Sequence, residues 1–122
     1  MNPSDITSSS IEELADGYRR AASAHGQATH AGDHETANRH HDMVAAIYRE
    51  LRARGRSAQE ALLPLMQDSD DAVRSWAASH ALEFAPEQAE SVLNVLAEGR
   101  GISAFNAKMT LREWRKGNLS FP

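Results

Sequence analysis

The sequence repeats itself after about thirty residues, and this periodicity restricts the possible folds more than any other feature. The apolar cluster that begins at Leu62 matches the cluster that begins at Val92 at an offset of thirty. After the next turn the offset becomes twenty-nine, where Val73 matches Ile102 and Trp76 matches Phe105. Repeats of this length are typical of stacked helical hairpins, since one hairpin cannot bury its apolar face alone. The repeat therefore predicts a short helical solenoid.

The spacing of apolar residues predicts an all-α chain throughout. Apolar positions recur every three or four residues, and most of the prolines and glycines stand between such segments. We expect about six helices in three antiparallel hairpins, over about residues 11–28, 33–55, 57–66, 70–84, 86–98 and 101–116. The chain then reads as a single domain with an N-terminal hairpin as cap layer (1–56), a first repeat (57–85), a degenerate second repeat (86–117) and a tail (118–122).

Local signals mark where these helices begin. Two pairs fit a capping box, in which a serine is followed by a glutamate three residues later. The expected N-caps and first-turn residues are Ser10 with Glu13, Asp33, Ser57 with Glu60, Asp70 or Asp71, and Pro86. Pro64 lies inside the third helix and removes a backbone donor, so we expect a bend or an early end there.

The segment from Leu65 to Arg74, followed by Ala77-Ala78 and Ala81-Leu82, resembles a HEAT-type repeat. The second copy departs from the pattern, because Glu98-Gly99-Arg100-Gly101 replaces the acidic turn. Residues 57–117 also resemble a bacterial family of short HEAT-like proteins catalogued as a domain of unknown function. The resemblance implies an α-α superhelix of the HEAT/ARM type, in which the second helices line a concave surface.

Composition excludes several classes of protein. The chain has no cysteine, which removes disulfides, thiolate metal sites and cysteine nucleophiles. The net charge of -4 gives no overall positive field for nucleic acid, and no apolar run approaches the ~20 residues that a membrane span needs. Without a leader-like N-terminus, we expect a cytoplasmic protein with no membrane association.

The implied concave surface supplies the candidate partner-binding residues. They lie on the second helix of each repeat and are Arg74, Ser75, Trp76, Ser79, His80 and Asn106. The competing interpretation, which the residue types favour, is that Trp76, His80 and their repeat equivalents Phe105 and Met109 fill the space between hairpins. Arg74 would then pair with Asp70 or Asp71.

Five of the six histidines lie between His25 and His41, around the first predicted turn. Imidazole suits Zn, Ni or Cu, so His25, His40 and His41 form a candidate metal site. The spacing matches no metal-binding signature, and the competing interpretation is a set of solvated polar residues. We expect no other cofactor.

The first hairpin and the tail carry further expectations. The rings of Tyr18 and Tyr48 should pack together with their hydroxyls at the rim. The arginines between Arg49 and Arg56 should form a solvated helix end. The tail, residues 119–122, should add exposed apolar groups, which favours a homodimer.

The leading functional hypothesis is a non-enzymatic module that binds a protein or peptide. The alternatives are a helical protein that binds a divalent metal and a HEAT-like protein that binds or repairs DNA. Because residues from Ser57 onward hold six basic and nine acidic residues, a nucleic-acid groove is disfavoured. The serines lack the G-x-S-x-G elbow of a nucleophile, and we expect no enzymatic activity.

Overall fold

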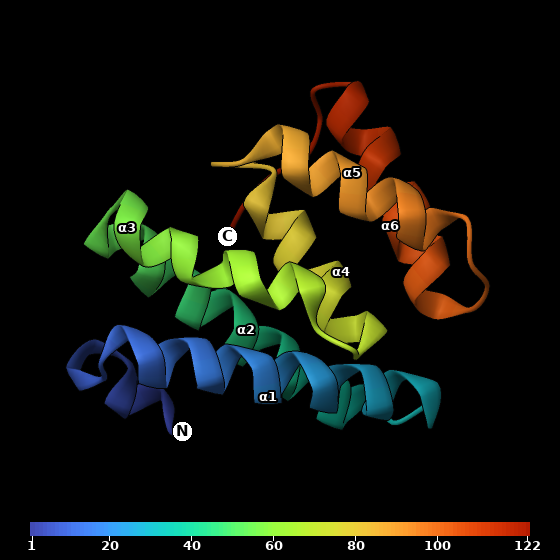
Figure 1. Cartoon of the computed structure of the whole chain (residues 1–122). Coiled ribbons are helices and arrows are strands. Elements are labelled where there is room, and N and C mark those ends of the chain that lie inside the picture. Colours follow the sequence, from blue (N-terminus) through green and yellow to red (C-terminus); the bar gives the residue numbers. More distant parts are fainter. The chain divides into compact units, whose positions relative to one another are not determined.

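The computed structural model describes residues 1–122, and the fold is all-α, as predicted. Six α-helices and two 3-10 helices follow one another without a strand. Their bounds are η1 Pro3–Ser8, α1 Ile11–His30, α2 His34–Arg54, α3 Arg56–Gln59, η2 Glu60–Gln67, α4 Asp71–Ala81, α5 Pro86–Ala97 and α6 Ile102–Arg115 (Figure 1). Among these helices there is none with the length and apolarity that crossing a bilayer requires.

Two compact units divide the chain. The first holds residues 1–62 together with Pro122, and the second holds residues 63–121. The boundary falls within η2, which contributes its first three residues to the first unit and the others to the second. Each unit has buried apolar residues of its own.

The first unit is built on α1 and α2, which pack along one another (Figure 1). Its core contains side chains that are completely shielded from solvent: Leu14, Tyr18, Ala22, Val44, Ile47, Tyr48 and Leu51. The expectation that the tyrosine hydroxyls reach the rim is wrong, since both tyrosines are 0% exposed. Gln59 donates a hydrogen bond to the hydroxyl of Tyr48 at 3.0 Å, and burial raises the pKa of Tyr18 well above its usual value.

The caps predicted for α1 and α2 are confirmed. The backbone N–H of Glu13 donates to Ser10 Oγ, and the backbone N–H of Ser10 donates to the Glu13 carboxylate at 2.8 Å. Asp33 accepts from the backbone N–H of Thr36 at 3.2 Å. These hydrogen bonds favour the ionised carboxylates, so the pKa values of Glu13 and Asp33 are lowered.

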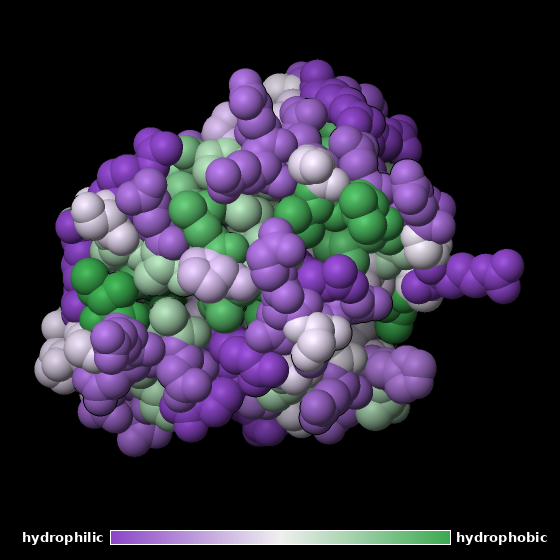
Figure 2. Space-filling view, viewed as in Figure 1, coloured by the Kyte–Doolittle hydropathy of each residue, from purple (hydrophilic) through white to green (hydrophobic).

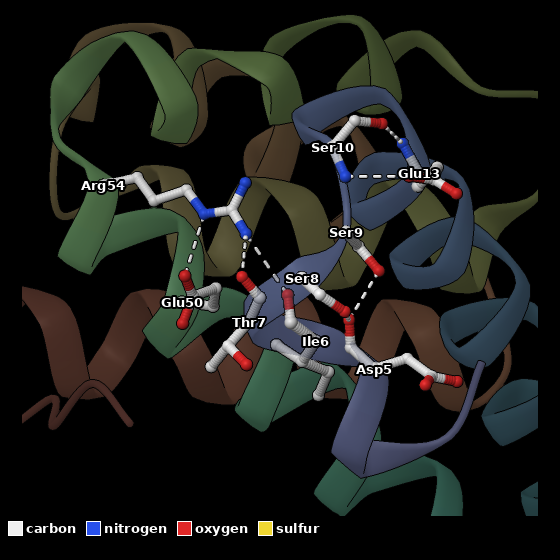
Figure 3. A network of polar contacts seen from close by, with 9 residues as sticks. All are labelled: Asp5, Ile6, Thr7, Ser8, Ser9, Ser10, Glu13, Glu50 and Arg54. Carbon is white, nitrogen blue, oxygen red and sulfur yellow. Dashed lines mark hydrogen bonds and ion pairs between the residues drawn. The ribbon is translucent and has the colours of Figure 1, made fainter.

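The arginine run at the end of α2 is only partly solvated. Arg54 donates to Glu50 at 2.8 Å, and its other branch donates to the carbonyl oxygens of Ile6 and Thr7 in η1, each at 3.2 Å (Figure 3). Arg52 lies over the ring of Tyr48 and donates to the carbonyl oxygen of Pro122. These two arginines therefore hold other parts of the first unit in place.

The segment after α2 differs from the single helix that the sequence predicts. Gly55, with a φ of 108°, adopts a backbone that other residues avoid and serves as the N-cap of α3. Ser57 consequently lies inside α3, and the predicted capping box with Glu60 is wrong. α3 ends at Gln59, and the chain continues as the 3-10 helix η2 around Pro64. Because Pro64 has no N–H, it cannot supply the hydrogen bond of a regular helix interior.

The second unit contains α4, α5 and α6, in which each helix packs against the other two. Asp70 caps α4 by accepting from the backbone N–H of Ala72 at 2.8 Å, and Pro86 opens α5, both as predicted. Trp114 Nε1 donates to Glu90 at 2.7 Å, which ties the end of α6 to α5. The core of this unit includes Val73, Ala77, Leu82, Ala89, Leu93, Ala107 and Leu111.

The tail is packed instead of exposed. The rings of Phe121 and Trp114 meet edge to face, with centroids 6.5 Å apart. Leu119, Phe121 and Pro122 are each partly buried. The expectation that the tail adds exposed apolar groups is therefore wrong, because an aromatic partner on α6 covers it.

Candidate functional site

The second unit has large apolar side chains that are exposed to solvent and are not part of its core. Five large hydrophobic residues of the chain are exposed, and three of them belong to α5 and α6. Val95 and Phe105 are each 61% exposed, and Ile102 is 44% exposed. Apolar side chains grouped on neighbouring helices are a common mark of a binding surface, whereas scattered ones are not.

A groove between η2 and α5 lies next to the first of these residues. It has a volume of about 490 Å³ and is lined by Leu63, Pro64, Met66, Gln67, Gln88, Ser91 and Val92. Val95 continues the same stripe of α5, since it follows Ser91 and Val92 by four and three residues. Figure 2 shows hydrophobic residues at the surface over α5. The groove therefore offers an apolar floor with polar amide side chains beside it.

The outer face of α6 is a second apolar stripe of the same unit. Ile102, Phe105 and Met109 succeed one another at spacings of three and four residues, which places them on one side of the helix. The opposite side carries Ala104, Ala107 and Leu111, which are buried. Met109 is half-buried, whereas Lys108 and Arg112, which lie beside this stripe, are exposed. This face is therefore both apolar and basic.

Charge is segregated along the second unit. Residues 63–99 hold one basic residue, Arg74, and seven acidic ones: Asp68, Asp70, Asp71, Glu83, Glu87, Glu90 and Glu98. Residues 100–121 hold a single acidic residue, Glu113, and five basic ones: Arg100, Lys108, Arg112, Arg115 and Lys116. The groove thus lies in the acidic segment, and the exposed stripe of α6 lies in the basic one.

The candidate partner-binding residues on α4 are buried or half-buried. Ser75 and His80 are 8% and 4% exposed, whereas Trp76 and Ser79 are half-buried. The ring centroids of Trp76 and His80 lie 5.7 Å apart. Asn106, by contrast, is exposed on α6. A role of these residues in partner binding stays a prediction.

Arg74 forms the local pair that its sequence context predicts. Its guanidinium is paired with the Asp71 carboxylate within the first turn of α4. The Nε atom of the same side chain is buried without a hydrogen-bond partner. Arg74 is thus held against the start of α4.

Phe105 is where the repeat comparison is wrong about packing. Its alignment with Trp76 predicts a ring that fills the space between hairpins, yet 61% of its surface is exposed. Phe105 lies on the side of α6 that faces away from Ala104 and Ala107, both of which are buried. The helical spacing from these alanines was the sequence signal for an outward ring.

The three candidate metal ligands lie on α1 and α2 but do not complete a site. The ring centroids of His25 and His41 are 6.2 Å apart. Burial, together with His41 and His40, lowers the pKa of His25. No group of three or more histidine, aspartate or glutamate residues is arranged to hold a metal ion. The structure therefore offers no support for the metal-binding alternative.

The groove was not among the sequence-predicted sites, although its residues carried a signal. The sequence interpretation placed the binding surface on the second helices, whereas the groove lies between η2 and the following first helix, α5. Within α5, Ala89, Leu93 and Leu96 form the buried stripe, and Val95 lies outside it. A large apolar residue off the buried stripe of a short helix indicates an exposed binding position.

Comparison with known proteins agrees with the all-α fold and places the chain in a family. A family described as "Domain of unknown function (DUF2019)" matches residues 12–114. The chain belongs to this family. The protein RPA1889 from Rhodopseudomonas palustris CGA009, known from a crystal structure, has a similar fold, with a TM-score of 0.90 at 24% sequence identity. The alignment covers 97% of this chain and 98% of that one. No curated protein matches this DUF2019 chain.

Proposed function

We propose that this DUF2019 protein is a non-enzymatic interaction module whose groove between η2 and α5 binds a basic, amphipathic helix of a protein partner. The observation that carries the proposal is the groove itself, continued by Val95 with 61% of its surface exposed. An apolar groove of this kind suits the apolar face of a helix, which presents side chains at spacings of three and four residues.

The charges around the groove define the partner further. Asp68 follows the groove residue Gln67, Glu87 precedes Gln88, and Glu98 stands three residues after Val95. Such a rim attracts lysine and arginine beside the apolar anchors and repels an acidic segment. The same rim argues against DNA as the ligand, because the segment that forms the groove, residues 63–99, contains seven acidic residues and one arginine.

We also propose that residues 57–117 form a short solenoid of the HEAT type. The support is the thirty-residue repeat, together with the packing of α4 against α5 and of α5 against α6. In such an array the candidate residues on α4 and Asn106 would form a separate surface. Trp76→Ala, which replaces a half-buried ring, tests whether that surface also takes part in binding.

A peptide-binding experiment tests the proposed groove. The probe is a fluorescein-labelled helical peptide with leucine at every third or fourth position and lysine elsewhere, and its acidic counterpart replaces lysine with glutamate. Fluorescence anisotropy should show saturable binding of the basic peptide, weakened by salt because the rim charges are exposed. Val95→Asp should weaken this binding by about ten-fold or more, since a charge then stands among the apolar anchors.

Asn38→Asp is the matched control, because it adds one negative charge at an exposed helical position of the first unit. Its affinity for the basic peptide should equal that of the unaltered chain. Equal binding of the basic and acidic peptides, or an unchanged affinity in Val95→Asp, would contradict the proposal.

A further inference from the structure

We propose that the helix received by the groove is α6 of a second copy of this chain, so that the protein associates with itself through two equivalent contacts. This inference rests on the proposed function of the groove and names its occupant. The observation behind it is that one unit carries both halves of a complementary pair. One half is an apolar groove whose lining residues Gln67 and Gln88 are followed and preceded by Asp68 and Glu87, and the other is an apolar, basic helix face.

The exposed face of α6 has the pattern that the groove is proposed to bind. Ile102, Phe105 and Met109 provide apolar anchors at spacings of three and four residues, and Arg112 continues the same side of the helix. Phe105 is the largest exposed anchor in the chain and is 61% exposed. An aromatic side chain of this kind is the usual centre of a protein interface.

Contacts within the unit prevent α6 from filling the groove of its own chain. Trp114 donates to Glu90, and Arg115 donates to Asn94 at 3.1 Å, so α6 is fixed on α5 through its C-terminal half. The buried side of α6 carries Ala104, Ala107 and Leu111. Its apolar, basic side therefore faces away from the core of the unit.

Charge complementarity singles out a second copy as the occupant. The groove belongs to residues 63–99, with seven acidic residues against one basic residue, and α6 belongs to residues 100–121, with five basic residues against one acidic. Opposite charges on the two surfaces favour the contact and set its orientation. If α6 of each copy enters the groove of the other, a two-fold axis relates the copies and both contacts form at once.

A charge-swap experiment tests self-association on the full chain. Sedimentation analysis of the unaltered protein should show a dimer, with the mass of two chains, and this dimer should dissociate as salt is added. Lys108→Glu with Arg112→Glu makes the α6 variant, and Glu87→Lys with Glu98→Lys makes the groove variant. The dimer affinity of each variant alone should be lower by about ten-fold or more, because its groove and its α6 then carry charge of the same sign and repel each other.

Mixing the two variants supplies the decisive measurement. The acidic α6 of one variant then meets the basic groove of the other, and the second contact joins the unaltered α6 to the unaltered groove. Because opposite charges face each other in both contacts, a mixed dimer should form. Circular dichroism checks that each variant keeps its helices. Phe105→Ser removes the central apolar anchor and leaves all charges unaltered, and it should also weaken the dimer.

The outcomes separate this inference from the proposed function. A monomeric protein at all concentrations that still binds the basic probe peptide would overturn self-association and leave the groove function standing. A dimer unaffected by the charge variants and by Phe105→Ser would overturn the assigned surfaces. Recovery of the dimer only in the mixture, together with displacement of the probe peptide by dimerisation, supports the inference.

Discussion

The two units of this chain use their apolar residues differently. In the first, both tyrosines and the leucines of α1 and α2 have no exposed surface, whereas in the second Val95 and Phe105 each expose 61% of theirs. Burial of a large side chain stabilises a fold by about 1.5–3 kcal/mol relative to exposure, so the second unit forgoes part of this gain. This difference supports the proposal that the second unit contacts a partner, although Ile11 of the first unit is also 38% exposed.

The charged residues show a similar contrast. In the first unit opposite charges lie one helical turn apart, as in Arg20 with Asp16 at 2.9 Å and Arg54 with Glu50 at 2.8 Å. The second unit has the local pair of Arg74 with Asp71, but seven of the eight charged residues in positions 63–99 are acidic and five of the six in positions 100–121 are basic. Local pairs cancel each other's field, whereas separated charges leave fields that a complementary surface can recognise.

The largest effect that tests this contrast is expected from a pair of core and surface truncations. Leu14→Ala removes a side chain with 0% exposure, and we expect a loss of about 2–5 kcal/mol in the free energy of unfolding. Phe105→Ala removes a larger but exposed side chain, and we expect a change within about 0.5 kcal/mol. Urea denaturation followed by circular dichroism measures both.

Equal losses in Leu14→Ala and Phe105→Ala would break the contrast between a stabilising and a binding unit. The protein concentration should be low enough to keep the chain monomeric, because a dimer would couple Phe105 to stability.

A smaller effect is expected from the network that fixes η1 (Figure 3). Arg54→Ala removes the donor to two carbonyl oxygens of η1 and the partner of Glu50, so we expect a loss of about 1 kcal/mol. Hydrogen exchange should also become faster in residues 3–9. Arg49→Ala removes an exposed arginine of the same helix and should leave both quantities unchanged. Matching results for the two variants would mean that the network contributes nothing.

The smallest effect is a pH dependence of the first unit. The pKa of His25 is lowered from its ordinary value of 6.5 by burial and by His41 and His40, so the unfolded chain binds a proton more readily than the folded one. Stability therefore falls as the pH drops below 6.5 toward the lowered pKa, and is fully present above 6.5.

Replacement of His25 by an uncharged side chain isolates this contribution. Melting temperatures of the unaltered chain and of His25→Asn, compared between about pH 7.5 and 5.5, should show a smaller acid-induced decrease in the variant. Identical decreases would show that His25 titrates alike in the folded and unfolded states.

The sequence predicts those features of the fold that depend on near neighbours. Ser10 with Glu13, Asp33 and Asp70 begin helices as expected, because each cap satisfies backbone groups within three residues. Pro86 opens α5 as expected because its fixed φ suits the first helical position and its missing N–H is not needed there. The prediction of Ser57 as an N-cap was wrong because Gly55, with its φ of 108°, caps the helix two residues earlier. Such competition between neighbouring caps is decided by backbone geometry.

The candidate site was less predictable, because exposure depends on packing between distant residues. The repeat aligns Phe105 with Trp76, but one is mostly exposed and the other half-buried, since a repeat transfers a position without its surroundings. The complete burial of Tyr48, whose hydroxyl accepts a hydrogen bond from Gln59, likewise depends on tertiary packing. The groove arises from η2 and α5, whose lining residues are about twenty-five positions apart.

The aromatic residues give each unit its own optical signal. Tyr18 and Tyr48 belong to the first unit, whereas Trp76, beside His80, and Trp114, beside Phe121, both belong to the second. Tryptophan emission, excited at wavelengths that tyrosine does not absorb, therefore follows the second unit, and the shorter-wavelength tyrosine emission follows the first. Superimposable melting curves from the two signals would show that the units unfold as one cooperative body, whereas separate curves would resolve two folding domains within a single short chain.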